Sequence, residues 1–282
     1  MNYVLRPLSK AELELLFNND AKKVIEFFIK KSIFSQPERA VWESIKKIQI
    51  PKEHIEDWVV QALWVSWVWA GSYAVDVINE KEHRWADIKM LATKTDDFWN
   101  ITNAESWEAS LAQKFKWTWA NLDQLFEEWK YDEIKDGRIG IYDKKMQNVI
   151  KDKNLEHVYY IILLRWDKSL YIVWMESYEE NLQYVSVDIE RTSWGKHKKS
   201  VESVFLSWFI DDKLWSTKIY KAKKRLELRI KPKARIDRWL FLEFPINKYL
   251  SNTEINLLEV LKAEHNLDDY WIREATKLFK WE

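Results

Sequence analysis

The amino-acid sequence predicts an α/β protein with a mixed central β-sheet flanked by helices. Segments with helical spacing come first, short segments rich in β-branched and aromatic residues follow, and two helical segments close the chain. This order of elements is typical of a sheet covered by helices. Because no internal repeat and no Pro/Gly/Ser-rich linker divides the chain, residues 1–282 are expected to form a single domain.

The expected helices rest on apolar residues that recur every three or four positions. In the first helix Leu13, Leu16 and Val24 share one face, and Ser9 with Glu12 forms a capping box that starts it. The ranges expected to be helical are 9–32, 36–48, 51–63, 106–115, 121–129, 252–263 and 267–279. Short apolar runs bounded by charged turns are typical of strands. The ranges expected to be strands are 72–79, 86–93, 158–164, 170–176, 184–189, 201–209, 218–230 and 239–244.

Charge and composition exclude several classes of protein. The 45 basic and 45 acidic residues balance, so affinity for nucleic acid must come from local patches rather than from net charge. The absence of cysteine excludes a disulfide scaffold, a Cys-ligated zinc site and a thiol nucleophile, and it fits a cytoplasmic protein. The apolar window Val59–Val77 is interrupted by Gln61, Asp76 and the turn-like Ala70-Gly71-Ser72, so no membrane span is expected.

Tryptophan and glycine occur in unusual numbers, 19 Trp against 4 Gly. An average domain of this length holds roughly 20 glycines, because glycine makes up about 7% of residues. Several tryptophans stand where a turn is expected and glycine is the usual residue. They are Trp85, Trp99, Trp117, Trp119, Trp166 and Trp215. We hypothesise that many of these codons are UGA read as glycine in the source organism; the alternative is a Trp-rich protein that binds sugars or stacked bases.

Two acidic residues, Asp76 and Asp87, lie on neighbouring expected strands, and Lys89 follows the second of them. A turn within residues 81–85 would bring Asp76 beside Asp87. Lys89 would share a face with Asp87, because positions i and i+2 of a strand point the same way. Two carboxylates can hold Mg²⁺, which prefers oxygen ligands and keeps several waters. Such a metal acidifies an attacking water, and a lysine can orient that water or neutralise a phosphate.

The pattern of Asp76 followed by Asp87-Ile88-Lys89 resembles the PD-(D/E)xK superfamily of nucleases, although the proline of that name is absent before Asp76. With tryptophan read as glycine, residues 55–130 resemble the catalytic core of type II restriction endonucleases. The resemblance implies a restriction-endonuclease-like fold in which Asp76 and Asp87 bind Mg²⁺ and Lys89 assists the water. It gives no role to the strand-rich and helical C-terminal part.

The resemblance also implies a third metal-binding acid from a preceding helix, for which Glu56 is the candidate and Glu43 the reserve. The substrate would be double-stranded DNA cut at a specific sequence. Because two cuts in a duplex usually need two active sites, a homodimer or a paired subunit is expected.

Basic residues around the expected site are candidates for DNA contacts. Lys94, Lys114 and Lys116 follow the two strands, while Lys196 and Lys198 belong to a basic loop that can equally be an ordinary charged loop. A second basic stretch covers residues 221–233. Two alternatives to a restriction enzyme stay open: a DNA-repair nuclease of the same fold, and a non-catalytic Trp-rich protein that binds nucleic acid or carbohydrate.

Overall fold

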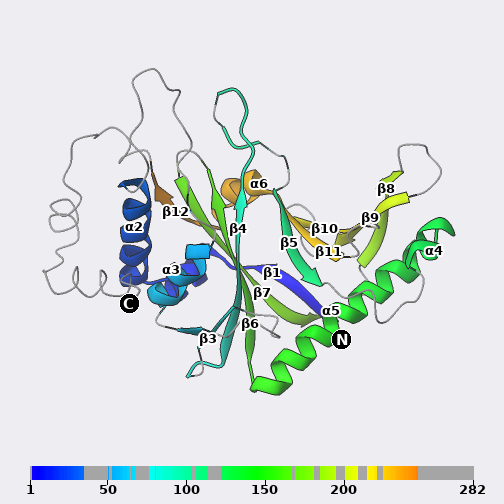
Figure 1. Ribbon diagram of the computed structural model, residues 1–282, viewed down its shortest axis with the longest axis horizontal. Helices are drawn as coiled ribbons and strands as arrows, with labels where there is room; N and C mark the ends of the chain where they lie inside the picture. Colours follow the sequence, from blue (N-terminus) through cyan, green and yellow to red (C-terminus); the bar gives the residue numbers. More distant parts are fainter. Residues whose placement is uncertain are drawn as a thin grey trace, which may run out of the picture.

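Two β-sheets and the helices that cover them are seen in a computed structural model of the chain (Figure 1). The structure describes residues 2–34, 50, 53–63, 65–67, 76–79, 81–98, 100–102, 104, 106–112, 122–166, 169–180, 185–194, 201–208, 215–220 and 225–246. The mixed α/β class expected from the sequence is confirmed. The helices expected at 36–48, 252–263 and 267–279 lie outside the described residues.

The larger sheet has seven strands in the order β1-β7-β6-β4-β3-β2, with β12 also paired to β7. Its strands are β1 (Asn2–Pro7), β2 (Ser66–Trp67), β3 (Val77–Asn79), β4 (Arg84–Ala92), β6 (His157–Arg165), β7 (Ser169–Glu180) and β12 (Leu242–Pro245). Only β4 and β6 pair in parallel, and the other neighbours are antiparallel, so the sheet is mixed. Parallel neighbours need a crossover connection, and the chain between β4 and β6 supplies it.

The second sheet is antiparallel, with the order β5-β11-β10-β9-β8. Its strands are β5 (Ser106–Ala112), β8 (Val185–Trp194), β9 (Val201–Trp208), β10 (Trp215–Tyr220) and β11 (Arg225–Ile230). The helix expected at 106–115 is therefore wrong for residues 106–112, which form β5 and pair with β11, and residues 113–115 lie outside the described part. Pairing with a strand more than 100 residues later overrides the helical preference of its Ala, Glu and Leu residues.

Six helices lie in the described part of the chain: α1 (Lys10–Leu16), α2 (Asn19–Phe34), α3 (Glu53–Leu63), α4 (Leu122–Glu127), α5 (Tyr131–Lys153) and α6 (Pro232–Asp237). The capping box of Ser9 and Glu12 is confirmed at the start of α1. The single helix expected at 9–32 is two helices, because the Asn18 side chain accepts hydrogen bonds from the next N–H groups, at 3.1 Å from Asp20 and 2.9 Å from Ala21. Such a cap starts a new helix.

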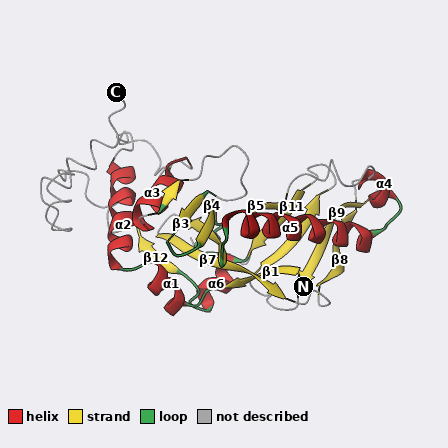
Figure 2. Ribbon diagram, turned by 90° about the horizontal axis from the view of Figure 1, so that it is seen from below, coloured by secondary structure: helices red, strands yellow, loops and turns green. Residues whose placement is uncertain are grey.

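The two faces of the larger sheet are covered by different helices (Figures 1 and 2). On one face α1, α2 and α3 pack against Ala86, Ile88 and Ile161. On the other face α5 packs against Trp85, Tyr160 and neighbouring side chains, and the same core continues into the second sheet. Figure 2 shows α5 running lengthwise past the strands of both sheets. Side chains therefore alternate between two separate cores along β4 and β6.

No helix in the described residues is both long and apolar enough to cross a membrane. The apolar window Val59–Val77 is not one helix, because α3 ends at Leu63 and β3 begins at Val77.

Two helix ends hold tryptophan in the left-handed backbone region. Trp129 follows α4 with a φ of 61°, and Trp239 follows α6 with a φ of 58°. At both ends the N–H of the next residue donates to a carbonyl oxygen five positions back, at 3.0 Å. This hydrogen bond marks the kind of helix end at which glycine is the usual left-handed residue. The described glycines, Gly137 and Gly140, lie inside α5 instead.

The expectation that six tryptophans stand in turns is wrong for two of them. Trp85 is a buried residue of β4 and Trp215 lies in β10. Trp166 does lie in the β6–β7 turn, where its N–H donates to Ser169 O at 3.0 Å. Positive φ among the described non-glycine residues occurs only at His83, Trp129, Asn154 and Trp239. The remaining turn candidates, Trp99, Trp117 and Trp119, lie outside the described residues.

Candidate active site

The β3–β4 hairpin brings the two acidic residues together. Asp76 directly precedes β3, and its N–H donates at 3.0 Å to the carbonyl oxygen of Ala86, the register partner of Val77 at the end of the ladder. In the turn, the Asn79 side chain accepts a hydrogen bond from Glu82 N–H at 3.2 Å, and His83 takes a φ of 50°. The strand resumes at Arg84, slightly earlier than expected. Asp76 therefore lies beside Asp87, as the sequence predicts.

Lys89 joins the two acids. Its Nζ donates to Asp76 Oδ2 at 3.2 Å, to Asp87 Oδ1 and to Ile88 O at 3.1 Å. Ile88 N–H donates to the same Asp76 Oδ2 at 2.7 Å, which fixes that carboxylate against β4. One ammonium group is therefore surrounded by three oxygen atoms from adjacent strands.

The cluster is partly open to solvent. The Asp87 side chain is only 7% exposed, whereas the side chains of Asp76 and Lys89 keep 20% and 24% of their surface exposed. Asp76 and Lys89 are therefore the members of the cluster that keep contact with solvent.

The environment of Asp87 raises the pKa of its carboxyl group to about 7. Burial is the largest cause, the neighbouring Asp76 adds to it, and Lys89 opposes it. Burial alone would lower the pKa of the Lys89 ammonium, but Asp87 and Asp76 outweigh burial, and the pKa is raised. The two acids therefore need a positive charge between them, which Lys89 supplies here.

Helix α5 adds residues that sequence reasoning missed. Tyr160 on β6 is the register partner of Asp87, and the Lys145 Nζ lies 5.9 Å from the centre of the Tyr160 ring. Tyr142, one turn before Lys145, forms a 3.0 Å hydrogen bond with Ser177 on β7. No helix is expected at 131–153 from the sequence, so Lys145 could not be placed near the acids in advance.

The structure does not bring Glu56 to the pair. Glu56 lies on α3, whose buried side chains pack with Ala86 and Ile88 on the face of the sheet opposite to Asp87. In the part of the chain that the structure describes, no three His, Asp or Glu side chains lie close enough to share a metal ion. Glu43 lies outside that part. Two carboxylates suffice for Mg²⁺, which usually keeps several waters.

Of the lysines expected to contact DNA, only Lys94 is described; it is exposed, just beyond the end of β4. Lys114, Lys116, Lys196 and Lys198 lie outside the described residues, as does the start of the basic stretch at 221–233.

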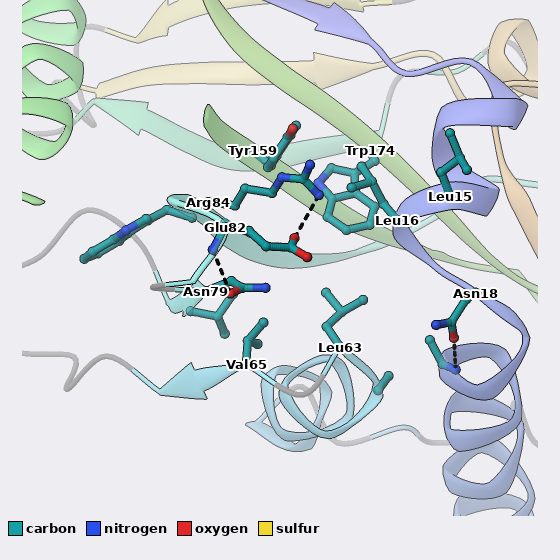
Figure 3. A pocket seen from close by; sticks show the side chains of 15 residues that line it. Leu15, Leu16, Asn18, Leu63, Val65, Asn79, Glu82, Arg84, Tyr159 and Trp174 are labelled. Carbon is teal, nitrogen blue, oxygen red and sulfur yellow. Dashed lines mark hydrogen bonds and ion pairs between the residues drawn. The ribbon is translucent and has the colours of Figure 1, made fainter. Parts of the chain in front are cut away.

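A cavity of about 210 Å³ lies away from the acids, between α1, α2, α3 and the β3–β4 hairpin (Figure 3). Its walls include Leu16, Leu63, Tyr159 and Trp174, and its polar side chains include Arg84. Glu82 pairs with Arg84 at 2.9 Å. These walls belong to the face of the sheet that carries Ala86, so the cavity and the acidic pair do not form one site. The acidic pair is the stronger candidate because it combines two carboxylates, one ammonium and a raised carboxyl pKa.

Comparison of the chain with protein-family models, with curated proteins and with solved structures finds no match.

Proposed function

We propose that the protein is a Mg²⁺-dependent endonuclease of restriction type, which hydrolyses phosphodiester bonds of double-stranded DNA at a specific sequence. The observation that carries this proposal is the contact of one lysine, Lys89, with two carboxylates, Asp76 and Asp87, across a two-stranded hairpin. The mixed sheet flanked by helices agrees with the resemblance to PD-(D/E)xK nucleases.

The donor atoms of the site fit magnesium. Asp76 and Asp87 are hard oxygen ligands that already surround a cation, the Lys89 ammonium. The pKa of Asp87 is raised chiefly by burial, and a bound cation would favour its ionised form. These two residues would hold the ion. Mg²⁺ bound there would acidify the attacking water and stabilise negative charge on the phosphate. Lys89 keeps its ammonium within hydrogen-bond distance of both acids, where it can orient that water or contact a phosphate oxygen.

The alternative of a Trp-rich binding surface has less support. Stacking on bases or sugars needs exposed rings that lie together. In the part of the chain that the structure describes, Trp58, Trp85 and Trp174 are buried, while the exposed Trp129 and Trp239 follow different helices. A DNA-repair nuclease would use the same acidic pair, so the cleavage pattern has to separate it from a restriction enzyme.

The test is incubation of the purified protein with plasmid and bacteriophage DNA in the presence of Mg²⁺. We expect discrete fragments that depend on the metal, and their loss in Asp76→Asn and Lys89→Met. Glu82→Gln, on the exposed turn of the same hairpin, is the matched control and should keep cleavage. Cleavage that survives Asp76→Asn, or no Mg²⁺-dependent cleavage at all, would rule out the proposal. A continuous smear would favour the repair nuclease, and light scattering would test the expected homodimer.

A further inference from the structure

Helix α5 carries a second lysine toward the acidic pair. Tyr142, Met146 and Val149 form the buried side of α5 that packs on the sheet. Lys145 lies three residues after Tyr142, so it lies near the same side of the helix. Its Nζ is 5.9 Å from the ring of Tyr160, and Tyr160 is paired directly with Asp87 in the β4–β6 register. Lys145 therefore lies over the part of the sheet that holds Asp87.

The electrostatic surroundings of Lys145 are those of the candidate site. Burial lowers the pKa of its ammonium, Asp87 and Asp76 act in the opposite direction, and Lys89 adds to the lowering. A partly buried lysine is costly unless opposite charges compensate it. The charges that act on Lys145 thus include the two acids and the lysine that are proposed to perform the reaction.

We propose that Lys145 is a second phosphate-binding lysine of the site, and that it contacts a non-bridging oxygen of the phosphodiester that is cut. This inference rests on the proposed nuclease function. An ammonium group cannot ligate a metal ion, and a metal held by Asp76 and Asp87 would repel it. A phosphodiester bound beside that metal would place negative charge near Lys145. That charge grows in the transition state, so the contact accelerates the reaction rather than only binding DNA.

The absence of cysteine from the chain allows a direct test. In Lys145→Cys the single thiol can be alkylated with 2-bromoethylamine, which restores an ammonium at nearly the length of lysine. Iodoacetamide adds a neutral group to the same atom and is the matched control. We expect Lys145→Cys to lower kcat for DNA cleavage by about 100-fold, aminoethylation to restore it to within about tenfold, and iodoacetamide to leave it low. The Mg²⁺ concentration for half-maximal cleavage should not rise, because Lys145 does not bind the metal and its positive charge opposes the ion.

Equal recovery with both reagents would overturn the inference, because it would show that bulk rather than charge matters. Cleavage by unmodified Lys145→Cys within about threefold of the wild-type rate would overturn it as well. If Lys145→Cys does not fold, as judged by thermal unfolding, Lys145→Met replaces it, because methionine keeps most of the length of lysine without the charge. Cleavage by Lys145→Met within about threefold of the wild-type rate would likewise overturn the inference.

The two proposals fail in different ways. If Asp76→Asn abolishes cleavage and Lys145→Cys does not reduce it, the nuclease assignment holds and the role of Lys145 is wrong. If the wild-type protein shows no Mg²⁺-dependent cleavage, the nuclease function fails, and the role of Lys145 fails with it.

Discussion

The two faces of β4 differ in chemistry although their side chains alternate along one strand. Ala86 and Ile88 point into an apolar core with α2 and α3. Asp87 and Lys89 point to the side of α5, where Tyr160 and Lys145 also lie. Burying charges is costly, and an apolar replacement of similar volume is often as stable. The apolar face therefore serves stability, whereas the charged face is the one to which we assign the proposed chemistry.

Removing a charge from the charged face should have the largest effect on the rate of DNA cleavage. Asp76→Asn removes one of the two carboxylates that contact Lys89, and it leaves an amide of the same shape. We expect DNA cleavage to fall by about 10³-fold or more, because both the metal site and the orientation of Lys89 are lost. The measurement is single-turnover cleavage at saturating Mg²⁺. A fall of less than tenfold, with normal folding by circular dichroism, would contradict the assignment.

A substitution on the apolar face should instead lower the free energy of unfolding. Ile161 on β6 is fully buried beside Ile88, on the side of α2 and α3. Ile161→Ala should lower the free energy of unfolding by about 3 kcal/mol, because it removes buried methyl groups and leaves a cavity. The Mg²⁺ concentration for half-maximal cleavage should stay unchanged below the unfolding temperature. Urea unfolding and cleavage of the same samples measure both quantities, and a shift in metal dependence alone would show that the two faces are not independent.

The pH dependence should belong to the charged face. With a pKa raised to about 7, chiefly by burial, Asp87 is protonated in slightly acidic solution without a metal. Mg²⁺ binding needs the carboxylate, so binding should release a proton near neutral pH, and affinity should rise until the pH exceeds about 7. Calorimetry in two buffers of different ionisation enthalpy counts that proton. Equal heats in both buffers at pH 6.5 would contradict the prediction.

The same pKa shift sets the sign of a stability change. The folded state holds the Asp87 proton more tightly than the unfolded chain does. Protonation of Asp87 therefore contributes to the free energy of unfolding, and this contribution is fully present below the ordinary pKa of an aspartate, about 4. That contribution is lost as pH rises through about 7. The metal-free protein should therefore lose stability between pH 5 and pH 8, and Asp87→Asn should remove that part of the slope in urea unfolding.

The charged face could be predicted from the sequence because its geometry is local. A short turn and the two-residue period of a strand determine the relation of Asp76, Asp87 and Lys89. The contribution of α5 could not be predicted in this way: the helix has weak apolar periodicity and contains Gly137 and Gly140. The expected position of Glu56 beside the two acids differs from the structure for a related reason. Apolar periodicity predicts the helix that carries Glu56, but it does not predict the face of the sheet on which that helix packs. The pairing of β5 with β11 depends on contacts that are distant in sequence.

Outside both faces, the two left-handed tryptophans allow the smallest and most specific test. The left-handed conformation costs an L-residue roughly 1–2 kcal/mol and costs glycine almost nothing. Trp239 recovers part of this through its stacking on Phe241, at 6.1 Å, and through Lys10, which lies 5.9 Å from its ring. Trp239→Gly should therefore raise the free energy of unfolding by about 1 kcal/mol.

Trp239→Ala is the control for this gain, because it keeps the Cβ atom in the left-handed position and loses the ring contacts. It should be no more stable than the chain with tryptophan, and equal gains in Ala and Gly would show that the ring, not the backbone, is the source of strain. Reading UGA as glycine makes the matching prediction that the protein from its own cells carries glycine at 129 and 239. A mass spectrum with tryptophan at both positions would reject that reading for these two helix ends, and a mass that matches all 19 tryptophans would reject it for the whole chain.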